Sequence, residues 1–209
     1  MSEHNPWQEP VIEFYRQYKH FIIISIILLF AVLGGWEFQK QTVKNNNAQL
    51  SILQSQWVKQ NSAKDSNHHS TLEQMKALNK TALITQLVMA AAAKNELMSN
   101  PQNAVKIYKE LLTVCFQPFC DLYRLRLSII YINMKAPNEA ISVLKSITEP
   151  SFLLFRDLYL GDSYKTLNDD AQAVLIWKQA YGRIHTQNMD PISKGIKDQL
   201  TYRLQKEFS

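Results

Sequence analysis

The chain has 209 residues, a formal net charge of +5 and only five glycines. This length suffices for one or two domains, and long apolar runs with few glycines favour helices over a β-sandwich or barrel. The basic residues are scattered and are not interleaved with aromatic residues at base-stacking spacing, so the sequence does not indicate nucleic-acid binding.

The first expected element is a transmembrane helix over residues 21–36, which contain no charged residue. A span needs about 20 apolar residues, so this one depends on its flanks. Tyr18 and Trp36 are placed where the headgroups would lie, and Lys19 and Lys40 can extend outward from the two ends. The alternative is a cleaved signal peptide, but the segment before the span is rich in acidic and aromatic residues rather than basic ones. Basic residues on the two sides nearly balance, which leaves the orientation open.

A tether is expected to follow over residues 37–69. Apolar residues three to four positions apart predict a helix over 37–60. The segment 61–69 has no apolar period and predicts a polar loop. Ser70-Thr71-Leu72-Glu73 has the form of a capping box, so the next helix is predicted to begin at Ser70.

The segment 85–181 contains three units in which small and bulky residues recur at the same spacing. Each unit begins with a small residue, and the other positions follow it by 3, 12, 16 and 19 residues. The successive alanines at the third position are 36 and 33 residues apart, which is the period of the tetratricopeptide repeat. The units are Ala92, Asn95, Ala104, Tyr108 and Leu111; Ser128, Tyr131, Ala140, Leu144 and Ile147; and Gly161, Tyr164, Ala173, Trp177 and Ala180.

Packing geometry explains this spacing. Two antiparallel helices approach closely only where small residues cross, and bulky residues one turn away fill the space beside each crossing. Pro101 and Pro137 predict helix starts, and Asn168 is predicted to cap a helix that begins at Asp169-Asp170. One unit cannot cover its own apolar face, so the three are expected to stack within a domain over 70–209. The alternative is an irregular helical bundle in which the spacing is accidental.

After the repeats, another helix is expected to begin at Pro191, with Asp190 as its cap. Its apolar residues are four positions apart and form one stripe, which we expect to cover the end of the solenoid or to dock on a partner. The predicted fold is therefore all-α, with an N-terminal transmembrane helix, an α-solenoid of about three tetratricopeptide-type helix pairs and a C-terminal capping helix. The stripe consists of Ile192, Ile196, Leu200, Leu204 and Phe208.

No residue pattern indicates catalysis, a cofactor or a metal, so we expect the protein not to be an enzyme. The sequence has no nucleophile with a base and no glycine-rich phosphate loop. The pair Asp169-Asp170 is a predicted helix start rather than an acid pair. The adjacent His68 and His69 lack further ligands at metal spacing, and His185 is a lone histidine expected at the surface.

Cys115 and Cys120 are the one reactive pair in the sequence. Pro118 between them enforces a bend that can bring their α-carbons within reach of a disulfide. An oxidising compartment would permit a structural disulfide here and leaves bonded and unbonded cysteines both open, whereas in the cytosol we expect two small buried thiols.

Several short segments occur in an order that resembles the ancillary SecYEG translocon subunit family of proteobacterial inner-membrane proteins, from about residue 12 onward. They are Gly34-Gly35-Trp36 at the end of the span, Lys94-Asn95-Glu96-Leu97, and the repeat with Gly161, Asp162 and Ala173. The resemblance implies a bacterial inner-membrane protein with a cytoplasmic segment 1–20 and a periplasmic repeat domain. It also implies association with the translocon and work with periplasmic chaperones on newly exported proteins. The chain departs from the family in its polar segment 61–69 and its cysteine pair.

The expected function is that of an adaptor for protein partners, namely translocon subunits, a periplasmic chaperone or exported clients. The first helices of stacked repeats line a concave groove that can hold a helix or an extended segment. The alternatives are that the groove is covered by residues 70–84 or by the C-terminal helix, or that the chain is a structural scaffold of another envelope assembly such as a secretion or pilus machine. The residues at groove-facing positions are Met89, Ala93, Leu122, Leu125, Ile129, Phe155 and Leu158.

Overall fold

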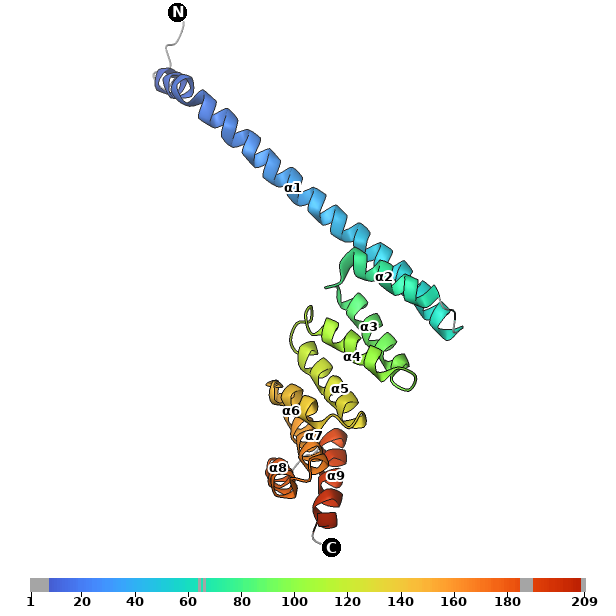
Figure 1. The fold of residues 1–209 in the computed structure, drawn as a ribbon. Coiled ribbons are helices and arrows are strands. Elements are labelled where there is room, and N and C mark those ends of the chain that lie inside the picture. The colour runs from blue at the N-terminus through green and yellow to red at the C-terminus, as the bar shows by residue number, and fades with distance from the viewer. Residues whose placement is uncertain (1–7, 64, 66, 185–189, 208–209) are drawn as a thin grey trace, which may run out of the picture. The chain divides into compact units, whose positions relative to one another are not determined.

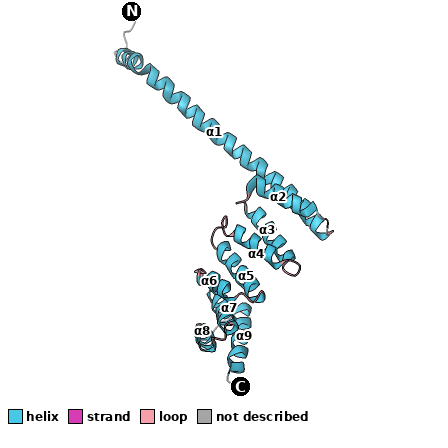
Figure 2. Cartoon of the chain, viewed as in Figure 1, coloured by secondary structure: helices cyan, strands magenta, loops and turns pink. Residues whose placement is uncertain are grey.

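The computed structural model of the chain describes residues 8–63, 65, 67–184 and 190–207, without the side chains of residues 8–27, 30, 31 and 34. All regular elements in these residues are helices (Figures 1 and 2). The chain divides into two compact units, Met1–Ile52 and Leu53–Ser209. The helices are α1 (Gln8–Ser62), α2 (Asn67–Asn79), α3 (Leu83–Glu96), α4 (Pro101–Leu111), α5 (Phe119–Asn133), α6 (Pro137–Lys145), the short 3-10 helix η1 (Pro150–Phe152), α7 (Leu153–Thr166), α8 (Asp170–Gly182) and α9 (Pro191–Glu207).

Helix α1 contains the whole segment expected to span a membrane. It continues without a break through residues 37–60, the helical part of the predicted tether, and has 55 residues in all. Among the described residues, no helix combines the length and the apolar character that a membrane crossing requires. Many side chains of residues 21–36 lie outside the described part of the chain, so the span stays a prediction.

The second unit contains the predicted helix pairs in chain order. Helix α3 packs against α4, α5 against α6, and α7 against α8. Contacts of α4 with α5 and of α6 with α7 join each pair to the next (Figure 1). The second unit is therefore a stack of helix pairs, as the repeat spacing predicts.

A further helix pair, which the sequence analysis did not identify, precedes the three predicted ones. It is formed by the last turns of α1 and by α2, where the Thr71 hydroxyl donates a hydrogen bond to Oε1 of Gln60 at 2.7 Å. Thr71 and Met75 are buried. They precede Ala104 and Tyr108 by 33 residues each, so two of the five repeat positions recur one unit toward the N-terminus.

Small residues lie at the helix crossings, as the spacing predicts. Ala104, Ala140 and Ala173 are completely buried. A Cβ added to Gly161 of α7 would overlap the indole of Trp177 of α8. The two helices can therefore cross this closely only with a glycine at position 161. The indole itself is fixed, because its Nε1 donates a hydrogen bond to the carbonyl oxygen of Leu158 at 3.1 Å.

The exception in the repeat pattern, Asn95, has a structural explanation. The other two units carry Tyr131 and Tyr164 at this position. Asn95 is exposed, and its side-chain amide donates a hydrogen bond to Oδ1 of Asn61 at 2.7 Å. A polar residue therefore suits this position, because its partner belongs to the polar end of α1 rather than to a buried face.

Asp121, in the first turn of α5, connects the pair of α5 and α6 to the segment that leads into α7. Its side chain is completely buried, and its Oδ2 accepts hydrogen bonds from the backbone N–H groups of Thr148 at 3.0 Å and Glu149 at 2.8 Å. Its Oδ1 accepts a hydrogen bond from Arg124 at 2.5 Å. Burial alone would raise the pKa of this carboxyl, but the bonds from Glu149, Arg124 and Thr148 outweigh it and hold the pKa below its usual range.

One predicted helix start is wrong by three residues. Helix α2 begins at Asn67 rather than at Ser70, and the expected loop 61–69 is correspondingly shorter. The reason is that Oδ1 of Asp65 accepts the backbone N–H of Asn67 at 3.0 Å, which supports an earlier start.

The cap of α8 also differs from the prediction by one residue. Asp169, not Asn168, is the cap, and its Oδ1 accepts the backbone N–H of Gln172 at 3.2 Å. Asn168 instead adopts a φ of 61° in the preceding turn. Asparagine tolerates this left-handed conformation better than most residues, which explains its presence there.

Helix α9 begins where the sequence predicts. Oδ1 of Asp190 accepts the backbone N–H groups of Ile192 at 2.9 Å and Ser193 at 3.1 Å, as expected for its cap. Ile196 and Leu200 from the predicted stripe are buried. Ile192, at the start of the stripe, remains exposed.

The stripe of α9 covers the end of the helix stack. Leu200 belongs to a buried cluster with Trp177 and Ala180 of α8. Arg203 of α9 adds a fork of two hydrogen bonds to Asp162 of α7, at 2.5 and 2.7 Å. The predicted role of α9 as a cap on the solenoid is therefore consistent with its contacts, while Phe208 lies outside the described residues.

Candidate functional site

A partly open cavity of about 390 Å³ lies along the first helices of the three predicted pairs. Helices α3, α5 and α7 contribute most of its wall, and α4 contributes one tyrosine. Six of its lining side chains are aliphatic or phenyl groups. The lining residues are Lys94, Leu97, Tyr108, Leu122, Leu125, Arg126, Ile129, Ile130, Asn133, Phe155 and Tyr159, and we call this cavity the groove.

Helix α5 forms the floor of the groove through the regular spacing of its residues. Leu122, Arg126, Ile129 and Asn133 follow one another at intervals of four, three and four residues. This spacing puts the four side chains on one face of the helix. Apolar and polar side chains alternate along this face, so the groove has both apolar and polar positions for a bound molecule.

The structure brings together four of the seven residues predicted to face a groove, namely Leu122, Leu125, Ile129 and Phe155, which all line the cavity. Met89, Ala93 and Leu158 lie elsewhere and are at most 1% exposed. Met89 borders a separate, smaller cavity of about 170 Å³ between α2, α3 and α4. Leu158 packs in the cluster around Trp177.

Sequence reasoning missed the polar lining residues because it selected apolar residues only. Lys94, Arg126, Asn133 and Tyr159 all contribute to the groove. For the residues of α5 a signal was present, since Arg126 and Asn133 continue the helical spacing that starts at Leu122. A search by helix face rather than by residue type would have included them.

The charge of the groove is positive. Lys94 and Arg126 line it, and among the described residues no acidic side chain does. Burial raises the pKa of the Tyr108 hydroxyl, which the neighbouring Arg126 guanidinium only partly opposes. Burial, together with the nearby Asp162 carboxylate, raises the pKa of Tyr159. Both tyrosines are therefore neutral hydrogen-bonding groups at neutral pH, and the two cations determine the charge.

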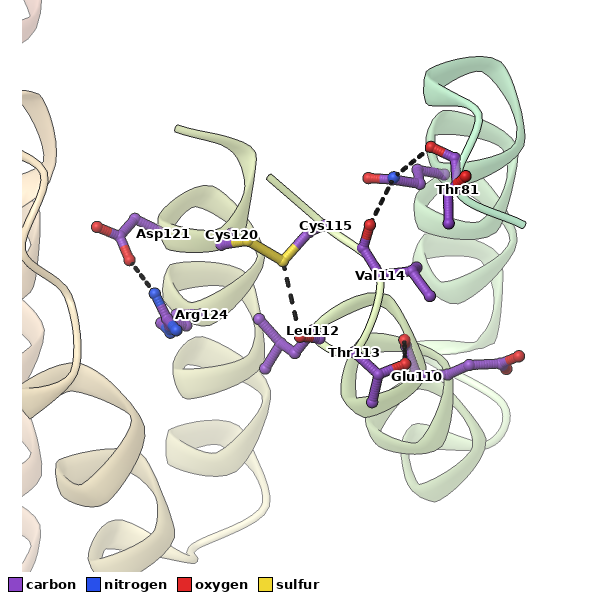
Figure 3. Close-up of a disulfide and its surroundings, with 10 residues drawn as sticks. Thr81, Glu110, Leu112, Thr113, Val114, Cys115, Cys120, Asp121 and Arg124 are labelled. Carbon is purple, nitrogen blue, oxygen red and sulfur yellow. Dashed lines mark hydrogen bonds and ion pairs between the residues drawn. A yellow bond between two sulfur atoms is a disulfide. The ribbon is translucent and has the colours of Figure 1, made fainter. Parts of the chain in front are cut away.

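Cys115 and Cys120 form a disulfide at the turn between α4 and α5, with α-carbons 5.3 Å apart (Figure 3). The turn is also held to α3, because Nε2 of Gln86 donates hydrogen bonds to the carbonyl oxygens of Thr81 at 3.0 Å and Val114 at 3.1 Å. Asp121 follows Cys120 directly in the sequence, but its carboxylate points away from the disulfide and toward Arg124 (Figure 3). The cysteine pair thus stabilises the junction between the first and second predicted pairs.

Replacing both cysteines, Cys115→Ser with Cys120→Ser, is expected to lower the free energy of unfolding by about 2 kcal/mol, because the disulfide closes only a short loop in the unfolded chain. Urea unfolding of the oxidised chain, the reduced chain and the double variant measures this. The reduced chain and the double variant should share one lowered midpoint, and reductant should not shift the variant further. An unchanged midpoint after complete reduction would contradict this prediction.

Histidines and acids do not form a metal site in the described chain. No group of three or more histidine, cysteine, aspartate or glutamate side chains is placed there to hold an ion. His68 and His69 lie in the first turn of α2, with ring centroids 4.0 Å apart. Nδ1 of His68 is engaged by the carbonyl oxygen of Asp65. His185 lies outside the described residues.

Comparison with known proteins gives one match. The family model described as a tetratricopeptide repeat-like domain matches residues 13–201. No curated protein and no solved structure matches the chain.

Proposed function

Because this chain belongs to the tetratricopeptide repeat-like domain family, we propose that it is a non-enzymatic adaptor that binds partner proteins in the groove of its second unit. Stacked repeats of this kind offer extended concave surfaces for protein partners. The observation that carries the proposal is the partly open cavity of about 390 Å³ with its six apolar lining side chains. Covering apolar surface that is exposed to water lowers the free energy, so binding of a partner in the groove is favoured.

The groove suits a modest, reversible interaction. A single helix or extended segment would bury only part of a standard protein interface there, so we expect a dissociation constant of about 1 μM or weaker. Attachment of the adaptor close to its partners would raise their effective concentration without any new contact. An anchor therefore fits this function.

The proposed anchor is the uncharged segment 21–36. Five of its described apolar side chains are more than half exposed to solvent, namely Leu28, Leu29, Val32, Leu33 and Trp36. Such a surface on one helix favours contact with lipid or with another protein. We assign it to lipid because the flanking aromatic and basic residues suit the two interfaces of a bilayer.

The proposed location is the bacterial inner membrane, with the N-terminal segment cytoplasmic and the repeat domain periplasmic. Two observations support it: the resemblance to the ancillary SecYEG translocon subunit family, and the pairing of Cys115 with Cys120, since disulfides persist in oxidising compartments. There the adaptor would receive exported clients near the translocon and pass them to periplasmic chaperones.

The test combines topology with site-specific crosslinking in intact cells. A reporter active only outside the cytoplasm is fused after Ser209, and a photoreactive amino acid is placed at Asn133, which is exposed and lines the groove. The matched control carries the same group at Gln179, which is exposed on α8 and does not line the groove. We expect an active reporter, and we expect Asn133 but not Gln179 to capture translocon subunits, a chaperone or exported proteins.

Other outcomes separate the alternatives. A reporter that is inactive because the C-terminus is cytoplasmic would contradict the envelope location. Capture of one stoichiometric component of a secretion or pilus machine would instead favour a structural scaffold. Equal capture from Asn133 and Gln179 would contradict the role of the groove.

A further inference from the structure

The groove carries information about the chemistry of its partner. We propose that it selects a segment in which a glutamate or aspartate lies next to the apolar residues that fill it. This inference rests on the proposed function and concerns the same groove. The partner's carboxylate would face Arg126 and Lys94.

The two cations line the groove without a carboxylate of their own. Lys94 lies near the end of α3 and Arg126 in the middle of α5, and both are exposed. In the described part of the chain neither is paired with an acid. Because neither cation has an acidic partner among the described residues to give up, a carboxylate of a bound segment displaces water rather than an acid from it.

The acidic residues on the helices of the groove wall do not neutralise Lys94 and Arg126. Each of these acids either pairs with another residue or does not line the groove. Asp121 of α5 holds Arg124 and two backbone N–H groups. On α7, Asp157 pairs with Arg156 and Arg183, and Asp162 with Arg203. Glu110 of α4 is engaged by Lys76 and Lys80. Glu96 of α3 does not line the groove.

Arg126 is the better placed of the two cations to fix a carboxylate. It follows Leu122 by one helical turn and precedes Ile129 by one, so apolar positions lie on both sides of it. Tyr108, which also lines the groove, lies next to it. A guanidinium can donate two parallel hydrogen bonds to a carboxylate, which sets the register of a bound segment. The apolar wall then supplies affinity, and the charge supplies selectivity.

The inference is tested by fluorescence anisotropy with three labelled peptides and the full chain reconstituted in lipid nanodiscs. The peptides share their length and their leucine and phenylalanine residues, and carry glutamate, glutamine or lysine beside them. We expect the glutamate peptide to bind about tenfold more tightly than the glutamine peptide, and the lysine peptide to bind weakest. The preference should shrink as salt is raised, because the charges are at the surface.

Two variants locate the effect. Arg126→Gln is expected to remove most of the preference for the glutamate peptide over the glutamine peptide. Lys109→Gln is the matched control, since Lys109 is exposed on the neighbouring α4 and does not line the groove. It should leave all three affinities as they are.

The failures of the inference and of the proposed function are distinguishable. Equal binding of the three peptides, or a glutamate preference that survives Arg126→Gln, overturns the inference alone. Stronger binding of the lysine peptide overturns it as well. If none of the three peptides binds and Asn133 captures no protein in cells, the proposed function fails and takes this inference with it.

Discussion

Replacing Gly161 with alanine is expected to lower the free energy of unfolding of the second unit by about 3 kcal/mol. The added methyl group would overlap the indole of Trp177. This ring is 2% exposed and its N–H is committed to the carbonyl oxygen of Leu158, so it can move only by giving up packing and that hydrogen bond. Urea unfolding followed by circular dichroism would measure the loss.

The matched control is Gly195→Ala in α9. Nothing lies within 4 Å of the position where its Cβ would be built. Alanine favours a helix over glycine by about 1 kcal/mol, so this variant should be as stable as the parent chain or slightly more stable. If Gly161→Ala behaved like Gly195→Ala, the close crossing of α7 and α8 would be contradicted.

Replacing Asp121 with alanine is expected to cost about 3 kcal/mol of stability, because it leaves one guanidinium and two backbone N–H groups without their buried acceptor. The loss should appear in the connection between α6 and α7, where Thr148 and Glu149 donate to this carboxylate. Hydrogen exchange of these two amides measures it locally, and urea unfolding measures it globally. Asp170→Ala is the control, since this carboxylate is 60% exposed in its pair with Lys165 and should contribute little.

The same carboxylate predicts a dependence of stability on pH. Its pKa in the folded state is lowered, so its contribution is fully present above its unfolded pKa of about 3.9 and is lost as the pH falls through the folded value. The stability difference between the parent chain and Asp121→Ala should therefore be constant near neutral pH and shrink below about pH 4. A difference that stays constant down to the acid unfolding transition would contradict the lowered pKa.

The repeat spacing determined much of the fold before any tertiary structure was considered. Close helix crossings require small residues at fixed offsets, so Ala104, Ala140, Ala173 and Gly161 could be assigned from the sequence, and all are buried. Asp190 could be assigned as a cap because capping depends on residues two and three positions away. The fourth helix pair carried a weaker signal, with Thr71 in place of alanine.

The sequence alone also determined which face of α5 points into the groove, since helical periodicity is local. Only the tertiary structure decided how deep each residue lies on its face, because depth depends on which neighbouring helix covers it. Leu158 and Phe155 are both on α7, yet Leu158 is packed beneath Trp177 while Phe155 reaches the cavity. The tertiary structure also decided that Lys94 and Arg126 line the same groove and that no acidic residue of the described chain lines it. Charged residues that are distant in sequence come close together only when the helices stack.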